Sequence, residues 1–138
     1  MEINETTVLD DRGFIQVNGD EAKEFLQNIV TNDLEKVSKN LTIFSSIFTP
    51  QGKYLYDFFI LKVEEGYLLE CEKEAVLEII KIFNFYKLRT KVNLVNFTKK
   101  YNSIIISLEK FKEINKNETL KGSTTTYNKE IMFIDPRN

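Results

Sequence analysis

The stretch that decides the fold is LTIFSSIFTPQGKYLYDFFILKVEEGYLLEC, residues 41–71. It holds three runs rich in Phe, Tyr, Ile and Leu, separated by a turn around Pro50 and Gly52 and by a second turn at 64–66. Such apolar runs are typical of strands, and Pro and Gly are typical of the turns between them. Because connections this short join antiparallel neighbours, the stretch predicts a three-stranded antiparallel meander.

An amphipathic helix is expected before this meander. In DEAKEFLQNIVTND, residues 20–33, apolar side chains recur at i, i+3, i+4 and i+7: Ala22, Phe25, Leu26 and Ile29. This spacing predicts a helix over about 20–30 that buries one face, and Asp20 is placed to cap its first turn. A short strand over 14–17 and a turn at 18–19 come before the helix.

A second helix is expected over about 73–85, with its apolar side chains facing the sheet. These side chains are Ala75, Val76, Ile79, Ile80 and Phe83. VNLVNF at 92–97 and SIIISL at 103–108 predict further strands, and the second is apolar enough to be central in the sheet. Polarity rises over 109–128, where little order is expected. The segment at 131–138 predicts a last strand that stops before Pro136.

These elements predict an α+β fold, a mainly antiparallel sheet covered by two helices. With 138 residues, the chain is expected to form one domain, residues 1–138. Its apolar clusters are far shorter than the roughly 20 residues of a membrane-spanning helix. The acidic start lacks the basic region and apolar core of a secretory signal. We therefore expect a soluble, cytoplasmic protein that does not contact a membrane.

The chain contains no His and a single Cys. This composition excludes Ser-His-Asp and Cys-His catalytic pairs, imidazole metal sites and CxxC-type zinc or redox sites. No metal site is predicted, and Cys71 is expected to be a small buried hydrophobe. Any catalysis would have to come from carboxylates, Lys, Tyr or a bound cofactor.

Charge is unevenly distributed although the net charge is only −2. Residues 1–36 hold nine acids and three bases, whereas residues 79–108 hold six bases and no acid. The basic segment is either a solvated face or a surface that attracts an anion. With a pI of about 5.3, a nucleic-acid partner is not expected.

Asp57 stands inside the apolar run of the second predicted strand. If residues 54–63 form a strand, Asp57 shares a face with Phe59 and Leu61. A carboxylate on such a face must find donors, shift its pKa upward or lie at a cavity. Alternatively, Asp57 lies only five residues beyond Gly52 and is hydrated near the mouth of the hairpin.

Three segments together resemble a known family: LDDRGFIQVNGDEAKEFLQNIVTNDL at 9–34, FTPQGKYLYDFFIL at 48–61 and FYKLRTKV at 85–92. They are similar to the N-terminal part of the glycine-cleavage T-protein superfamily. Within it they look most like the YgfZ-type folate-binding proteins that support the maturation of iron–sulfur enzymes. The resemblance covers most of residues 8–97.

The resemblance implies a tetrahydrofolate site in a central cavity. In T-proteins an acidic pair follows the matching turn, and here the two positions are Tyr56 and Asp57. The expected ligand site is therefore Asp57, with Tyr56 or Phe59 as the aromatic wall and Arg89 as the cation. A pterin ring offers N–H donors to a carboxylate and a flat face to an aromatic side chain.

The single acid favours a YgfZ-like accessory protein, with iron–sulfur enzymes or their assembly factors as partners. Two alternatives stay open, an aminomethyltransferase of the T-protein type and a non-catalytic interaction domain that has lost the site. The Lys-Gly-Cys motif of YgfZ-like chains is missing, and those chains are about twice as long. The sequence is therefore expected to be a fragment or a shortened relative.

Overall fold

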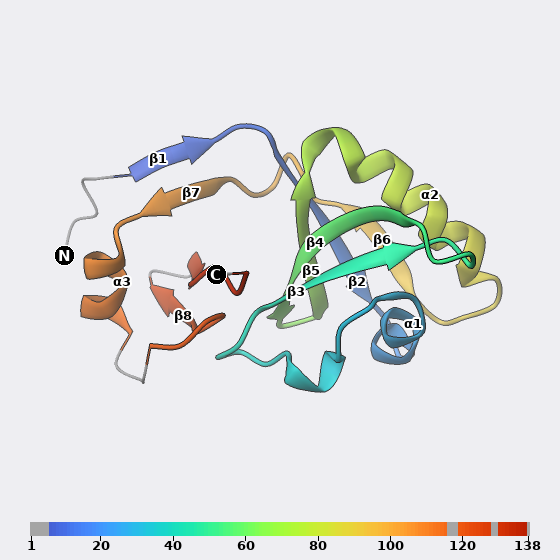
Figure 1. The fold of residues 1–138 in the computed structure, drawn as a ribbon, viewed down its shortest axis with the longest axis horizontal. Coiled ribbons are helices and arrows are strands. Elements are labelled where there is room, and N and C mark those ends of the chain that lie inside the picture. The colour runs from blue at the N-terminus through green and yellow to red at the C-terminus, as the bar shows by residue number, and fades with distance from the viewer. Residues whose placement is uncertain (1–5, 116–118, 128–129, 138) are drawn as a thin grey trace.

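The computed structural model describes residues 6–115, 119–127 and 130–137 (Figure 1). Its central sheet has five strands in the order β3-β4-β5-β2-β6, and all neighbours are antiparallel. The strands are β2 (Arg12–Asn18), β3 (Ile43–Phe48), β4 (Tyr54–Val63), β5 (Gly66–Glu72) and β6 (Asn93–Asn96). The predicted meander over 41–71 is confirmed, because β3, β4 and β5 pair consecutively.

The turn between β4 and β5 is tight because of Gly66. Its φ is +95°, a conformation that side chains other than glycine rarely adopt. A Cβ there would lie 2.3 Å from the carbonyl oxygen of Val17 on the neighbouring strand. Gly66 therefore allows β5 to start directly beside β2, and this contact helps to fix the strand order.

Two helices cover one face of the sheet, as predicted. They are α1 (Ala22–Ile29) and α2 (Val76–Lys87), the second entered through the 3-10 turn η2 (Lys73–Ala75). Phe83 of α2 is fully buried and meets Phe25 of α1 and Phe58 of β4 at ring distances of 5.8 and 6.2 Å. This aromatic contact holds both helices on the sheet.

The predicted cap of the first helix was wrong by one residue. The N-cap is Glu21, and its side chain makes no capping hydrogen bond. Instead, Glu21 Oε2 accepts the backbone N–H of Lys91 at 2.6 Å. The carboxylate therefore joins the start of α1 to the segment that follows α2.

The opposite face of the sheet carries a second apolar cluster, built on Phe14, Phe59, Leu61 and Leu68. A C-terminal hairpin, β8 (Thr124–Tyr127) and β9 (Glu130–Phe133), brings Phe133 onto this cluster. The hairpin is joined to the sheet near β3, where the Thr42 and Thr124 hydroxyls lie 2.8 Å apart in a buried hydrogen bond. Residues 41 and 123 also form a β-bridge.

The expectation that 103–108 forms a central strand was wrong. β7 (Ser103–Ile106) pairs with β1 (Thr6–Leu9) in a separate two-stranded sheet, at the end of the molecule away from α1 and α2 (Figure 1). Ile105 is 54% exposed there. The chain leaves the main sheet after β6. At this point the hydroxyl of Thr98 accepts a hydrogen bond from the backbone N–H of Phe14 at 3.1 Å.

The polar region after β7 is more ordered than expected. It contains α3 (Leu108–Ile114), whose first turn is capped by the Ser107 hydroxyl, and β8. Residues 116–118 and 128 of the predicted low-order stretch lie outside the described residues. Within the described ranges, no helix combines the length and the apolar character needed to cross a membrane.

Candidate functional site

Asp57 lies half-buried on the sheet face that the two helices leave open. Its cross-strand partner on the neighbouring strand β3 is Ser46. The Tyr54 hydroxyl donates a hydrogen bond to Asp57 Oδ2 at 2.7 Å. This bond raises the pKa of Tyr54 to about 12, because the phenol has to give up the bond when it ionises. Both expectations for Asp57 hold in part, since it is neither fully buried nor without a partner.

Phe59 occupies the centre of this open face and is only 6% exposed. Its ring contacts those of Phe44 and Phe133, at centroid distances of 5.5 and 5.1 Å. Two guanidinium groups lie over the same ring: Cζ of Arg137 is 4.9 Å from the centroid, and Cζ of Arg12 is 5.8 Å from it. Phe59 therefore presents an aromatic surface that already holds planar cations.

Glu70 is the acid beside this ring. It is the cross-strand partner of both Phe59 and Phe14, and it is only 6% exposed. None of the residues described here gives it a hydrogen bond or an ion pair. Among the described residues no side-chain oxygen is both buried and unpaired, so the carboxylate oxygens of Glu70 reach solvent and are free to accept a donor. We call the group of Asp57, Phe59, Glu70, Arg12 and Arg137 the Phe59 face.

Arg137 is paired with Asp135, two residues before it in the chain. Its Nε donates to Asp135 Oδ1 at 2.9 Å, and this bond is the main reason that the pKa of Arg137 is raised. The negative charges of Asp57 and Glu70 raise it further. The guanidinium is therefore a planar N–H donor held over an aromatic ring in the field of two carboxylates.

A groove of about 560 Å³ adjoins the Phe59 face. Arg137 belongs to both. Phe44, whose ring contacts that of Phe59, also lines the groove, so the groove continues from the aromatic surface. Two further cations, Lys36 and Lys121, line it. Its remaining walls are Asn32, Leu41, Thr42, Ile43 and Pro136. An anionic group in this groove would meet three positive side chains.

The structure brings together only part of the site expected from the sequence. Asp57 and Phe59 share a face, but Tyr56 points to the other side and packs against the helix-covered core. Arg89 lies exposed in the turn after α2. Among the residues described, no contact joins Arg89 to Asp57. These assignments remain predictions, and the cations that lie over the Phe59 ring are Arg137 and Arg12.

Sequence reasoning missed Glu70, Arg12 and Arg137. Glu70 could have been found, because the short turn at 64–66 fixes the β4–β5 register and sets position 70 opposite Phe59. Cys71, in contrast, is buried as predicted. Burial raises the pKa of its thiol to about 12, so it is a structural side chain rather than a reactive one.

Comparisons with known proteins match part of the chain. No protein-family model matches it. A protein from Pyricularia oryzae named iron-sulfur cluster assembly factor IBA57 homolog, mitochondrial, is 36% identical over 93 residues, which are 64% of this chain and 23% of the relative. An aminomethyltransferase from Desulforamulus reducens is 38% identical over 58 residues, 41% of this chain and 16% of the relative.

A solved structure shares the fold. The glycine cleavage system aminomethyltransferase T from Bartonella henselae superposes with a TM-score of 0.60 at 14% identity. The match covers 66% of this chain and 26% of that structure. In each comparison the chain matches about a quarter or less of the relative's length.

Proposed function

We propose that this chain, which matches part of an iron-sulfur cluster assembly factor IBA57 homolog and part of an aminomethyltransferase, is a YgfZ-like accessory protein of the glycine-cleavage T-protein superfamily. In this proposal it binds tetrahydrofolate and acts in the maturation of iron–sulfur proteins. Its partners would be iron–sulfur enzymes or their assembly factors. The proposed compartment is the cytoplasm. The mitochondrial location in the names of the fungal relatives is the alternative.

The observation that carries the folate proposal is the guanidinium of Arg137 on the Phe59 ring. The pyrimidine ring of a pterin contains a planar N–C(NH₂)–N unit shaped like a guanidinium, and its N3–H and amino group donate hydrogen bonds as a guanidinium does. A surface that holds a guanidinium beside Asp57 and Glu70 is therefore suited to hold the pterin ring. Carboxylates accept N–H donors, and the Phe59 ring supplies the stacking surface.

The adjoining groove suits the rest of the cofactor. Tetrahydrofolate ends in a glutamate tail with two carboxylates, and Lys36, Lys121 and Arg137 line the groove. Pairing of a guanidinium with a carboxylate is geometrically favourable. In this arrangement Asp57 and Glu70 would hold the pterin, and the three cations would hold the tail. The bound folate would supply any one-carbon chemistry.

The proposal is tested by anaerobic calorimetry with tetrahydrofolate on the full chain and on Asp57→Asn and Glu70→Gln. Loss of a charged contact to a ligand costs about 2–5 kcal/mol. Each variant should therefore bind at least tenfold more weakly, with a melting temperature close to that of the wild type. If the wild-type chain gives no heat and no thermal shift at millimolar tetrahydrofolate, the folate proposal is wrong.

Aminomethyl transfer is the second candidate, because a relative with 38% identity carries that name. T-proteins are expected to use an acidic pair, whereas this chain has Tyr56 beside Asp57. Tyr56 also packs on the helix-covered side, so Asp57 would be the one acid of that adjacent pair. Turnover of an aminomethylated lipoyl carrier with tetrahydrofolate would reverse this ranking.

A further inference from the structure

Strand β4 carries an irregularity directly before Asp57. The cross-strand partner of Phe48 is Tyr54, whereas the residue before Phe48 pairs with Tyr56, so Leu55 is an extra residue on β4. Regular alternation along a strand would set Tyr54 on the face opposite to Asp57, because the two are three residues apart. A bulge breaks this alternation and re-aims the side chains beside it. It therefore allows Tyr54 to reach the side chain of Asp57.

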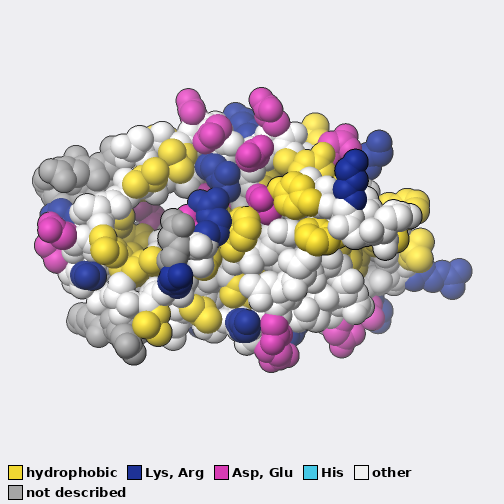
Figure 2. Space-filling model, viewed as in Figure 1, with side chains coloured by type: hydrophobic (Ala, Val, Ile, Leu, Met, Phe, Trp, Pro, Cys, Tyr) yellow, Lys and Arg dark blue, Asp and Glu magenta, His cyan; other side chains and the backbone are white. Residues whose placement is uncertain are grey.

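Tyr54 is held in this position from two sides. Its hydroxyl donates a hydrogen bond to Asp57 Oδ2 at 2.7 Å, and its ring meets the Phe48 ring edge-on at a centroid distance of 6.3 Å. Tyr54 is still 52% exposed. In Figure 2, basic, acidic and hydrophobic side chains lie side by side in the middle of the face in view, where Figure 1 labels β3 and β4. The hydroxyl and the carboxylate therefore meet where a ligand can approach.

The charges around the Tyr54 hydroxyl keep it protonated. Its hydrogen bond to Asp57 is the main reason that the pKa of Tyr54 is raised to about 12, and the negative charge of Glu72 adds to the effect. The phenol is therefore a hydrogen-bond donor at neutral pH. A carboxylate has about four acceptor positions, so Asp57 can accept this bond and still accept donors from a ligand.

We propose that Tyr54 is a positioning residue, whose hydroxyl holds the Asp57 carboxylate in the orientation that accepts the N–H donors of a pterin ring. This inference rests on the proposed function and adds a residue that acts through Asp57. A carboxylate on a free side chain rotates, and fixing it when a ligand binds costs free energy. Because the bond to Tyr54 restricts this rotation before the ligand arrives, it lowers that cost.

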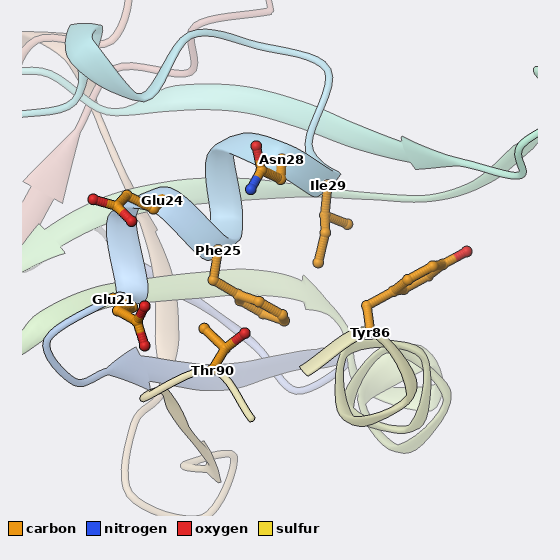
Figure 3. A pocket seen from close by; sticks show the side chains of 7 residues that line it. All are labelled: Glu21, Glu24, Phe25, Asn28, Ile29, Tyr86 and Thr90. Carbon is orange, nitrogen blue, oxygen red and sulfur yellow. The ribbon is translucent and has the colours of Figure 1, made fainter. Parts of the chain in front are cut away.

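Tyr86 offers a matched control on the other side of the sheet. It is 44% exposed, similar to Tyr54. Figure 3 shows its ring at the groove between α1 and the end of α2, where Phe25 and Ile29 of α1 also lie. These helices cover the face of the sheet opposite to Asp57. Removing the Tyr86 hydroxyl therefore leaves the Phe59 face unchanged.

The first test needs no ligand and compares the tyrosinate absorbance titrations of the wild type and Asp57→Asn. One late-titrating tyrosine should titrate earlier in Asp57→Asn, because the neutral amide accepts the phenol hydrogen bond less strongly than the carboxylate. Tyr67, whose pKa is raised by burial, should titrate late in both proteins. Identical titrations would show that the bond between Tyr54 and Asp57 does not form, and would overturn the proposal.

The second test is anaerobic calorimetry with tetrahydropterin on the full chain. Tyr54→Phe keeps the ring contact with Phe48 but lacks the hydroxyl, so it should bind roughly five- to tenfold more weakly at a similar melting temperature. Tyr86→Phe should bind as the wild type does. In an Asp57→Asn background, Tyr54→Phe should cause no further loss, because the two residues act as one unit. A merely structural effect of Tyr54 would weaken binding in both backgrounds.

The outcomes separate this inference from the proposed function. Equal affinities of the wild type and Tyr54→Phe would overturn the positioning role and leave the folate proposal standing. A loss of the same size with and without Asp57 would do the same. A wild type that does not bind tetrahydropterin would refute the folate proposal, and the role of Tyr54 in binding would fall with it.

Discussion

Replacing Arg137 by Gln tests whether its guanidinium stands where a pterin ring would bind. Its Cζ lies 4.9 Å from the Phe59 centroid and 5.4 Å from the Phe44 centroid. Each cation–π contact at a partly exposed site contributes about 0.5–1 kcal/mol. A ring that displaces the guanidinium while Arg137 keeps its hydrogen bonds to Asp135 has to overcome both ring contacts, about 1–2 kcal/mol. Arg137→Gln removes this cost, so tetrahydropterin should bind about 5- to 30-fold more tightly.

Tetrahydrofolate should respond differently from tetrahydropterin, because it carries the glutamate tail. Arg137 lines the groove together with Lys36 and Lys121. Once displaced from the aromatic rings, its guanidinium would be available to a tail carboxylate. A hydrogen bond to a charged group is worth about 1.5–3 kcal/mol. Arg137→Gln should therefore reduce the preference for tetrahydrofolate over tetrahydropterin by about 10- to 150-fold.

The assay is anaerobic calorimetry with both ligands on the wild type and Arg137→Gln. Lys53→Gln is the control, because it removes an exposed cation in the turn before β4 and should change neither affinity. An unchanged tetrahydropterin affinity in Arg137→Gln would refute the view that the guanidinium occupies the ring position. An unchanged preference between the ligands would show that the tail does not reach Arg137.

Four further predictions follow from other parts of the structure. Because the pKa of Tyr54 is raised to about 12, its stabilising bond to Asp57 should be complete below about pH 10 and be lost as pH rises toward 12. Titration of tyrosinate absorbance should lose one late-titrating tyrosine in Tyr54→Phe, whereas Tyr67, whose pKa is raised by burial, should still titrate late. The Cys71 thiol should resist labelling at pH 8 until denaturant is added, because it is buried and its pKa is about 12. Phe83→Ala should lower the free energy of unfolding by about 3–5 kcal/mol in urea titrations, since it empties a fully buried site. Arg89→Gln should leave tetrahydrofolate affinity unchanged in calorimetry, because no described contact joins Arg89 to Asp57. A tenfold loss of affinity would show that Arg89 does contact the ligand.

The meander and both covering helices could be predicted because their signals are local. Strand runs separated by short turns leave few pairings available, and the i, i+3, i+4 spacing identifies the buried face of a helix. Phe25 and Leu26 are buried as that spacing requires. The α+β class follows from the order of these elements.

The apolar run at 103–108 was misassigned because hydrophobicity does not determine which edge a strand joins. The main sheet ends at β6, and β7 does not pair with that edge strand. The turn at 97–101 then carries the chain away, and β7 pairs with β1 instead. The run of Ile residues predicts a buried strand, but the side chains of Ile104 and Ile105 are 42% and 54% exposed.

In the candidate site, too, the residues that local sequence signals indicate could be predicted, and those brought in from distant parts of the chain could not. Alternation along β4 sets Asp57 and Phe59 on one face, and the short turn before β5 then sets Glu70 opposite Phe59. Arg137 reaches that ring from the far end of the chain, so no sequence periodicity points to it. Arg89 is the cation that the sequence predicts, because it lies at the basic exit of the second helix and its planar guanidinium can bind a carboxylate, and that assignment stays a prediction. Charge density along a sequence indicates where cations are common, but only the tertiary fold determines which of them meets a given carboxylate.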